Sequence, residues 1–197
     1  MSDHTKVFTG VKIVSDETNG LVELDTIRRY NQDRAIKVRN NFVGHLYRAE
    51  SKRLNQIMEI LNQKLLAVGE NEIIVGLPTS GVIMAAGLSL VRGIPYNFGV
   101  EYEFENKDTA FYFHETDRGK DPQYLYGLKP GDNAIIIEDE VTSGNGVTEL
   151  TKALREWGVN VIAIASVVEA LNFDAREKIK TETGINLTSL VQIKLIE

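Results

Sequence analysis

Glu138 and Asp139 are adjacent carboxylic acids that directly follow an apolar run. That run, 135–137, is uninterrupted isoleucine, which is typical of a parallel strand covered on both faces, so the two acids should stand at the strand's carboxyl end. Open α/β sheets bind their ligands at that edge. Two carboxylates in this position can accept hydrogen bonds from neighbouring hydroxyl groups of a sugar.

The loop after the acids consists of small and hydroxyl-bearing residues: Thr142, Ser143, Gly144, Asn145 and Gly146. Apolar residues recur at helical spacing directly behind it, so this 142–146 loop should open a helix. Backbone N–H groups and the helix dipole favour an anion there, and small residues let it approach closely. The acids and the loop together suit a phosphorylated sugar, whose phosphate could sit there without a lysine.

A second turn of small residues comes earlier in the chain. Pro78, Thr79, Ser80 and Gly81 lie between an expected strand at 72–77 and an expected helix at about 82–91. Gly and Pro mark such junctions in many proteins, so a plain β-to-α turn explains this 78–81 turn as well as a binding loop does.

The polar stretch 105–128 is too long for an ordinary connection between two elements. We expect a mobile functional loop or a hairpin, with 111–113 as a short strand inside it. Its cations and histidine could serve a ligand, although a simply solvated loop has the same composition. These residues are Lys107, His114, Arg118 and Lys120.

Strands and helices should alternate from about residue 70 onward, which predicts an α/β fold with a parallel sheet and right-handed crossovers. The expected strands are 72–77, 96–104, 134–137, 159–168 and 187–196, and the expected helices are 82–91, 147–157 and 173–183. In the N-terminal third, 51–68 reads as an amphipathic helix, while 1–46 matches no clear pattern. Nothing in the composition calls for two domains, so we expect one domain over 1–197.

The composition excludes several kinds of chemistry. The 197 residues are 43% hydrophobic and 25% charged, as in ordinary globular proteins. The chain has no cysteine for disulfide or thiolate chemistry, and its three histidines are too scattered for a zinc site. Any metal should therefore arrive with the substrate. With no long apolar stretch and no signal-peptide pattern, we expect a cytoplasmic protein without a membrane partner.

The net charge of −6 is unevenly distributed, because 28–53 is locally basic. A solvated helical face or a subunit contact is the favoured interpretation, and nucleic acid is not an expected partner. Binding of an anionic substrate or of RNA is the alternative. The basic residues are Arg28, Arg29, Arg34, Lys37, Arg39, Arg48, Lys52 and Arg53.

The segment 134–147 resembles the phosphoribosyl pyrophosphate (PRPP) motif of type I phosphoribosyltransferases: four apolar residues, two acids, two variable positions and a phosphate loop. The resemblance spans about 70–195. Within that family the chain looks most like orotate phosphoribosyltransferase, a pyrimidine enzyme, through 128–131 before the motif and 93–96 with Phe98.

The resemblance implies the type I phosphoribosyltransferase fold, an open parallel sheet flanked by helices (70–197) with an N-terminal hood or helical region (1–69). It implies transfer of ribose 5-phosphate from PRPP to a nucleobase such as orotate, with release of pyrophosphate, in nucleotide biosynthesis or salvage. Mg²⁺ would come with the substrate, and a homodimer is typical. The implied roles are ribose binding and catalysis for Glu138 and Asp139, 5′-phosphate binding for Thr142, Ser143, Gly144, Asn145 and Gly146, diphosphate binding for Pro78, Thr79, Ser80 and Gly81, and leaving-group neutralisation for Arg118 and Lys120.

The chain departs from the orotate enzymes at three places. Ser80 stands where many of them have a diphosphate-binding lysine, 99–101 lacks their basic pair, and 117–121 scrambles their loop signature. The N-terminal 1–69 matches no hood. A non-catalytic PRPP-binding regulator is therefore an alternative, and an unrelated nucleotide-binding or receiver-like domain is another.

Overall fold

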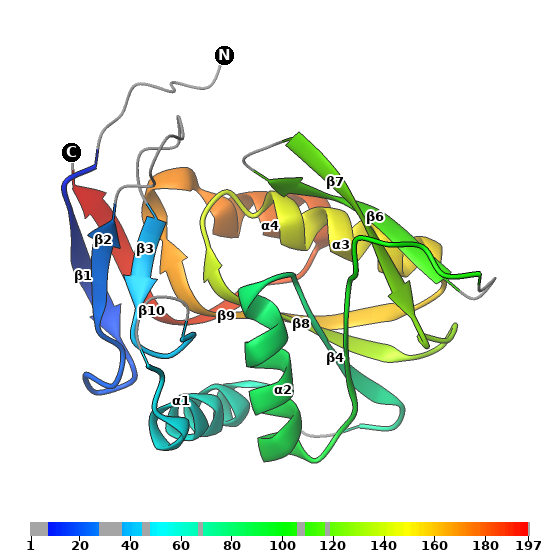
Figure 1. Cartoon of the computed structure of the whole chain (residues 1–197), viewed down its shortest axis with the longest axis horizontal. Helices are drawn as coiled ribbons and strands as arrows, with labels where there is room; N and C mark the ends of the chain where they lie inside the picture. The colour runs from blue at the N-terminus through cyan, green and yellow to red at the C-terminus, as the bar shows by residue number, and fades with distance from the viewer. Residues whose placement is uncertain are drawn as a thin grey trace.

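The computed structural model describes residues 8–27, 37–44, 48–66, 69–105, 109–116 and 119–196. Its centre is a six-stranded sheet in the order β1-β10-β9-β8-β4-β5 (Figure 1). The strands run parallel except β1, which is antiparallel to β10. Their bounds are β1 Gly10–Asp16, β4 Glu72–Gly76, β5 Tyr96–Phe98, β8 Asn133–Val141, β9 Asn160–Ala170 and β10 Leu187–Ile196.

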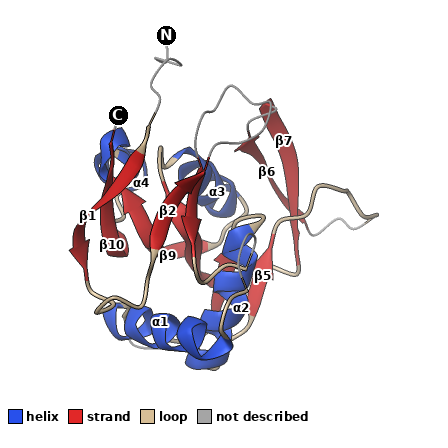
Figure 2. Ribbon diagram, turned by 60° about the vertical axis from the view of Figure 1, so that its left-hand side comes forward, coloured by secondary structure: helices blue, strands red, loops and turns tan. Residues whose placement is uncertain are grey.

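Helices cover both faces of this sheet (Figures 1 and 2). One face carries α1 (Ser51–Lys64) and α2 (Ser80–Arg92), and the other carries α3 (Asn145–Glu156) and α4 (Ala175–Thr183). The described part of the chain contains no helix with the length and apolarity to cross a membrane. The predicted α/β architecture with a mostly parallel sheet is confirmed.

The central strand β8 contributes side chains to both hydrophobic cores. Ile135 and Ile137 pack into the cluster under α1 and α2, whereas Ala134 and Ile136 pack into the cluster under α3 and α4. All four side chains are buried. Because side chains alternate along a strand, the two acids that follow them leave β8 on opposite sides.

Several elements differ in length from the sequence expectation. β5 ends at Phe98 rather than at 104, because the chain leaves the sheet there and Val100 instead bridges Tyr124 through two backbone hydrogen bonds of 3.0 and 2.9 Å. α1 ends at Lys64, short of 68. The expected helix at 173–183 starts two residues later, because a 3₁₀ turn, η1 (Leu171–Phe173), comes first and Asp174 has a left-handed backbone.

The stretch 105–128 contains a β-hairpin, as one of the two expectations had it. Its strands are β6 (Thr109–Thr116) and β7 (Gly119–Tyr126), and β6 includes the expected short strand at 111–113. β6 packs against α3, and the buried Leu125 and Leu128 join the core under that helix.

The N-terminal region forms strands that sequence reasoning left unassigned. β1 extends the sheet by pairing with the last strand, with Gly10 opposite Ile196. β2 (Leu24–Ile27) and β3 (Lys37–Asn40) form a separate antiparallel pair. Val38 of β3 and the following Phe42 are buried in the core under α1 and α2, so this pair is anchored beside the carboxyl ends of the sheet strands.

Candidate functional site

The carboxyl ends of β4 and β8 are neighbours, which brings the 78–81 turn beside the two acids. Gly76 of β4 is in register with Ile137 of β8, and the Leu77 N–H donates to the Ile137 carbonyl at 3.3 Å. Gly81 lies against the same strand: a Cβ there would come within 2.8 Å of the Ile137 carbonyl oxygen and 3.3 Å of Glu138 Oε1. Two motifs far apart in sequence therefore share one sheet edge.

The 78–81 turn brings the start of α2 very close to the end of β4. A Cβ on Gly76 would lie 2.3 Å from the Gly81 carbonyl oxygen, so a side chain at Gly76 would collide with the start of α2. The Pro78–Thr79 peptide bond is cis, and α2 begins at the buried Ser80. The first N–H groups of a helix have no partner within the helix, so the turn presents such donors next to Glu138.

Asp139 is held by a residue that sequence reasoning missed. Asp139 is only 7% exposed, and its Oδ2 accepts a hydrogen bond from Nδ2 of Asn40 at 3.2 Å. Oδ1 of Asn40 in turn accepts the N–H groups of Phe42 and Val43 at 3.3 and 2.9 Å. The end of β3 thus orients one of the two acids, and no local pattern around Asn40 signals this contact.

Glu138 lies in a different environment from its neighbour. Burial of its carboxyl, together with the negative charges of Asp139 and Glu140, raises its pKa well above the ordinary value. Its Oε1 accepts the Asp139 N–H at 3.1 Å. A ligand that brings hydroxyl donors or positive charge would favour the ionised form of this carboxyl group.

A cavity of about 110 Å³ joins Glu138 to the 142–146 loop. All five residues of the loop line it, whereas Asp139 is not among the lining residues. Glu140 is a further acidic wall residue, and β-strand alternation, which puts it on the same side as Glu138, could have predicted this. The lining consists of Leu77, Glu138, Glu140, Val141, Thr142, Ser143, Gly144, Asn145, Gly146 and Val147.

The 142–146 loop leads directly into the N-terminus of α3. Gly144 precedes α3 with a left-handed φ of 73°, and Asn145 is the first residue of the helix. Ser143 Oγ accepts the Asn145 N–H at 3.4 Å. A Cβ on Gly144 would meet Ile179 Cγ1 at 3.1 Å and Ala175 Cβ at 3.4 Å, so α4 supports the loop from below.

The basic residues expected near the leaving group are not placed by the structure. Lys107 and Arg118 lie outside the described residues, and for Lys120 only the backbone position in β7, opposite Glu115, is described. His114 is likewise described only by its backbone, in β6. The roles of Arg118 and Lys120 stay predictions.

The carboxylate oxygens at this edge suit Mg²⁺ with few direct protein ligands. Within the described ranges, no group of three or more His, Cys, Asp or Glu side chains could hold a metal ion. Mg²⁺ prefers oxygen ligands, and it commonly keeps waters and binds substrate phosphates with only one or two carboxylates. Glu138 and Asp139 fit that pattern.

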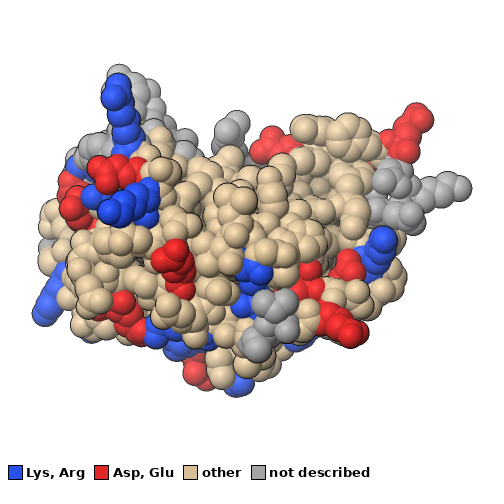
Figure 3. Space-filling view, turned by 90° about the horizontal axis from the view of Figure 1, so that it is seen from below, with Lys and Arg blue, Asp and Glu red and all other residues tan. Residues whose placement is uncertain are grey.

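The basic segment 28–53 contains paired charges where the structure describes it. Arg39 pairs with Asp25, and Arg53 lies 3.9 Å from Glu50. On the face that carries α1 and α2, Lys and Arg are interspersed with Asp and Glu (Figure 3). In the described part of this segment, basic side chains therefore lie beside acidic ones.

Comparison with known proteins places this fold in a family. The family model of the phosphoribosyl transferase domain matches residues 44–187, and the chain belongs to this family. It is 26% identical over 144 residues to the hypoxanthine/guanine phosphoribosyltransferase of Methanothermococcus okinawensis, covering 72% of this chain and 78% of that protein. It is 30% identical over 130 residues to the enzyme of the same name from Methanosphaerula palustris, covering 66% and 71%.

Solved structures of this family share the fold. The adenine phosphoribosyltransferase of Rhodothermus marinus superimposes with a TM-score of 0.70 at 15% identity, over 89% of this chain and 96% of that one. The APRTase of Giardia lamblia in complex with 9-deazaadenine gives the same TM-score and identity, over 89% and 95%. All these relatives are named for purine bases, so they do not support the expected specific likeness to orotate phosphoribosyltransferase.

Proposed function

We propose that this protein transfers ribose 5-phosphate from PRPP to a purine nucleobase and releases pyrophosphate. The observation that carries the proposal is the cavity that joins Glu138 to the 142–146 loop, with the 78–81 turn beside it. One sugar bearing a phosphate at one end and a diphosphate at the other requires three such neighbouring features. The purine assignment rests on the relatives, which are named for hypoxanthine, guanine or adenine.

The 5′-phosphate is proposed to bind in the 142–146 loop. The loop opens α3, so backbone N–H groups and the positive end of the helix dipole meet the anion. The hydroxyl groups of Thr142 and Ser143, which line the cavity, add donors. This anchoring positions the sugar for reaction.

The ribose hydroxyls are proposed to meet Glu138 and Asp139. As the bond from C1′ to the diphosphate breaks, the sugar becomes oxocarbenium-like, and nearby carboxylates stabilise the positive charge. The hydrogen bond from Asn40 keeps Asp139 in place for this role. Positioning and charge stabilisation are the main demands on the protein, so the proposed reaction needs no histidine-based catalytic set.

The leaving diphosphate is proposed to bind at Pro78, Thr79, Ser80 and Gly81, through backbone N–H groups at the start of α2. When bound, Mg²⁺ supplies charge neutralisation to the diphosphate. Arg118 and Lys120 of the β6–β7 region are proposed to approach the same diphosphate and to shield it from water. Assembly as a homodimer also stays a prediction.

The test is an assay for pyrophosphate release from PRPP with Mg²⁺ and single bases: hypoxanthine, guanine, adenine and orotate. We expect release with a purine and loss of release in the double variant Glu138→Gln, Asp139→Asn, with the circular dichroism spectrum unchanged. Unchanged activity in that variant would contradict the proposed site. Release with orotate alone would replace the purine assignment.

The regulator alternative predicts a different result. Calorimetry would then detect PRPP binding, while no base in the panel would cause pyrophosphate release. An unrelated nucleotide-binding domain would bind no PRPP at all.

A further inference from the structure

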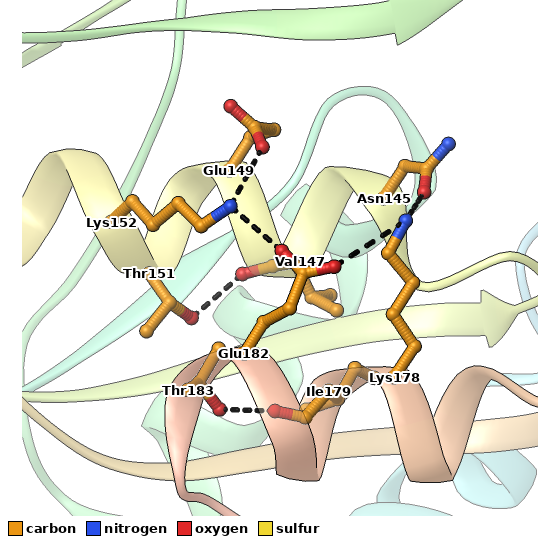
Figure 4. Close-up of polar contacts among 9 residues, drawn as sticks. All are labelled: Asn145, Val147, Glu149, Thr151, Lys152, Lys178, Ile179, Glu182 and Thr183. Carbon is orange, nitrogen blue, oxygen red and sulfur yellow. Dashed lines mark hydrogen bonds and ion pairs between the residues drawn. The ribbon is translucent and has the colours of Figure 1, made fainter.

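A chain of polar contacts runs across the surface of α3 and α4 and ends at the 142–146 loop (Figure 4). Lys152 of α3 contacts Glu149 at 3.3 Å and Glu182 of α4 at 2.7 Å. Glu182 also lies 3.9 Å from Lys178. The amine of Lys178 donates a hydrogen bond to Oδ1 of Asn145, the first residue of α3.

The helix that carries Lys178 is fixed directly beneath the loop. Ala175 and Ile179 of α4 are buried, and a Cβ added to Gly144 would contact both residues. The hydroxyl groups of Thr151 and Thr183 each donate to a carbonyl four residues earlier in their own helices, at 2.7 Å (Figure 4). These two hydroxyl groups are therefore satisfied within their own helices. Lys178 projects from a helix that is packed against the loop.

The contact from Lys178 fits only one orientation of the Asn145 amide. An ammonium group only donates hydrogen bonds, so the amide oxygen must face Lys178 and the amide nitrogen must face away from it. Figure 4 shows this arrangement, with the nitrogen on the far side of Asn145 from Lys178. Because Asn145 lines the cavity, Lys178 directly contacts one of the residues of the cavity wall.

Lys178 also brings a positive charge to a loop that has none. The segment 142–146 contains no Lys or Arg, whereas a sugar phosphate carries close to two negative charges at neutral pH. The direct hydrogen bond to Asn145 places the ammonium group next to the loop, while its acidic neighbour Glu182 is farther away, at 3.9 Å.

We propose that Lys178 is a positioning residue for the 5′-phosphate: it orients Asn145 and supplies the loop with positive charge from α4. The proposal rests on the proposed function, because it assigns the 142–146 loop to the sugar phosphate. It predicts a selective effect on ligands that carry the 5′-phosphate, since the 78–81 turn leads into α2, and α2 and α4 cover opposite faces of the sheet.

Calorimetric titration with ribose 5-phosphate and, separately, with pyrophosphate tests the proposal. In Lys178→Met we expect ribose 5-phosphate to bind about tenfold more weakly, equivalent to about 1.4 kcal/mol. The pyrophosphate affinity should change less than twofold. In the transfer assay KM for PRPP should rise about tenfold with kcat largely kept, and Lys178→Arg should restore most of the loss.

Lys152→Met is the matched control. Lys152 belongs to the same chain of contacts and also pairs with Glu182, but it does not touch the loop. Its removal should leave both affinities within twofold of wild type. Asn145→Ala gives an independent route to the same contact: on that background the further change Lys178→Met should have less than half its effect on wild type.

Failure of this proposal can be told apart from failure of the proposed function. If wild type binds ribose 5-phosphate and Lys178→Met binds it equally well, only the role of Lys178 is overturned. The proposal would also be overturned if Lys178→Met lost affinity for both ligands equally and had a lowered Tm, or if Lys152→Met lost as much affinity as Lys178→Met. Either result would show that the lysine contributes only to the general structure. A wild type that binds neither ribose 5-phosphate nor PRPP overturns both proposals.

Discussion

Asn40 and Asp139 are joined by a hydrogen bond of 3.2 Å between an N-terminal strand and the end of the central strand. Asp139 is buried at this point, so its orientation depends on a region that lies outside the matched part of the family, which begins at residue 44. The contact links the N-terminal strand pair to the acids of the candidate site.

Replacing Asn40 should therefore destabilise the protein and impair the site together. In Asn40→Ala the buried Asp139 carboxylate loses a donor, which costs about 1–3 kcal/mol of unfolding free energy. Urea denaturation measures the loss, and the KM for PRPP should rise in parallel. Asn55→Ala, which removes an exposed contact to Glu59 on α1, is the control and should change stability by less than about 0.5 kcal/mol. Equal stability of the two variants would show that the Asn40 contact contributes nothing.

Glu138→Gln should make the protein more stable at neutral pH while it weakens transfer. Burial and the neighbouring acids raise the pKa of Glu138 above its ordinary 4.5, so the folded state binds more protons than the unfolded chain. Stability is therefore lost as pH rises from about 4.5 through the folded-state pKa. The variant removes this loss, and its Tm should exceed that of wild type at about pH 8 but not at about pH 4. A Tm difference independent of pH would contradict a raised pKa of Glu138.

Arg176→Met should have the opposite pH dependence. Burial alone would raise the pKa of Glu169, but hydrogen bonds from Arg176, Ser189 and Gln192 outweigh it and lower that pKa. The stabilisation is present above the ordinary pKa and is lost as pH falls through the folded-state pKa. We expect a loss of about 2–3 kcal/mol at neutral pH, because a buried carboxylate loses a charged donor. In denaturation experiments the difference from wild type should shrink below about pH 4.

Gly144→Ala tests whether α4 must lie so close to the loop. An alanine there is strained at φ 73°, at a cost of about 1–2 kcal/mol, and its Cβ would press on Ile179 at 3.1 Å. We expect lower stability and at least tenfold weaker binding of ribose 5-phosphate. Gly184→Ala is a matched control, since Gly184 has a φ of 76° and a Cβ added there would meet no atom within 4 Å. It should lose similar stability but keep the affinity; loss of affinity in both variants would point to a global effect.

The order of elements from residue 70 onward could be predicted from sequence because their signals are local. The isoleucine run before Glu138 and the glycine-rich turns after it are patterns within a few residues of each other, and β10 begins and ends at the predicted residues. The acids at the end of β8 and the loop that opens α3 follow from the same local patterns.

Only the tertiary structure decided which distant residues support the site. β1 pairs with the last strand, Asn40 reaches Asp139, and Lys178 reaches Asn145, and each contact joins segments far apart along the chain. The structure also separates the two acids, with Glu138 in the cavity and Asp139 against β3. Such contacts depend on sheet order and on the packing of α4 under the loop, which arise from burial of apolar faces summed over the whole domain. A local residue pattern sets which groups can do chemistry, while this long-range packing sets which of them meet.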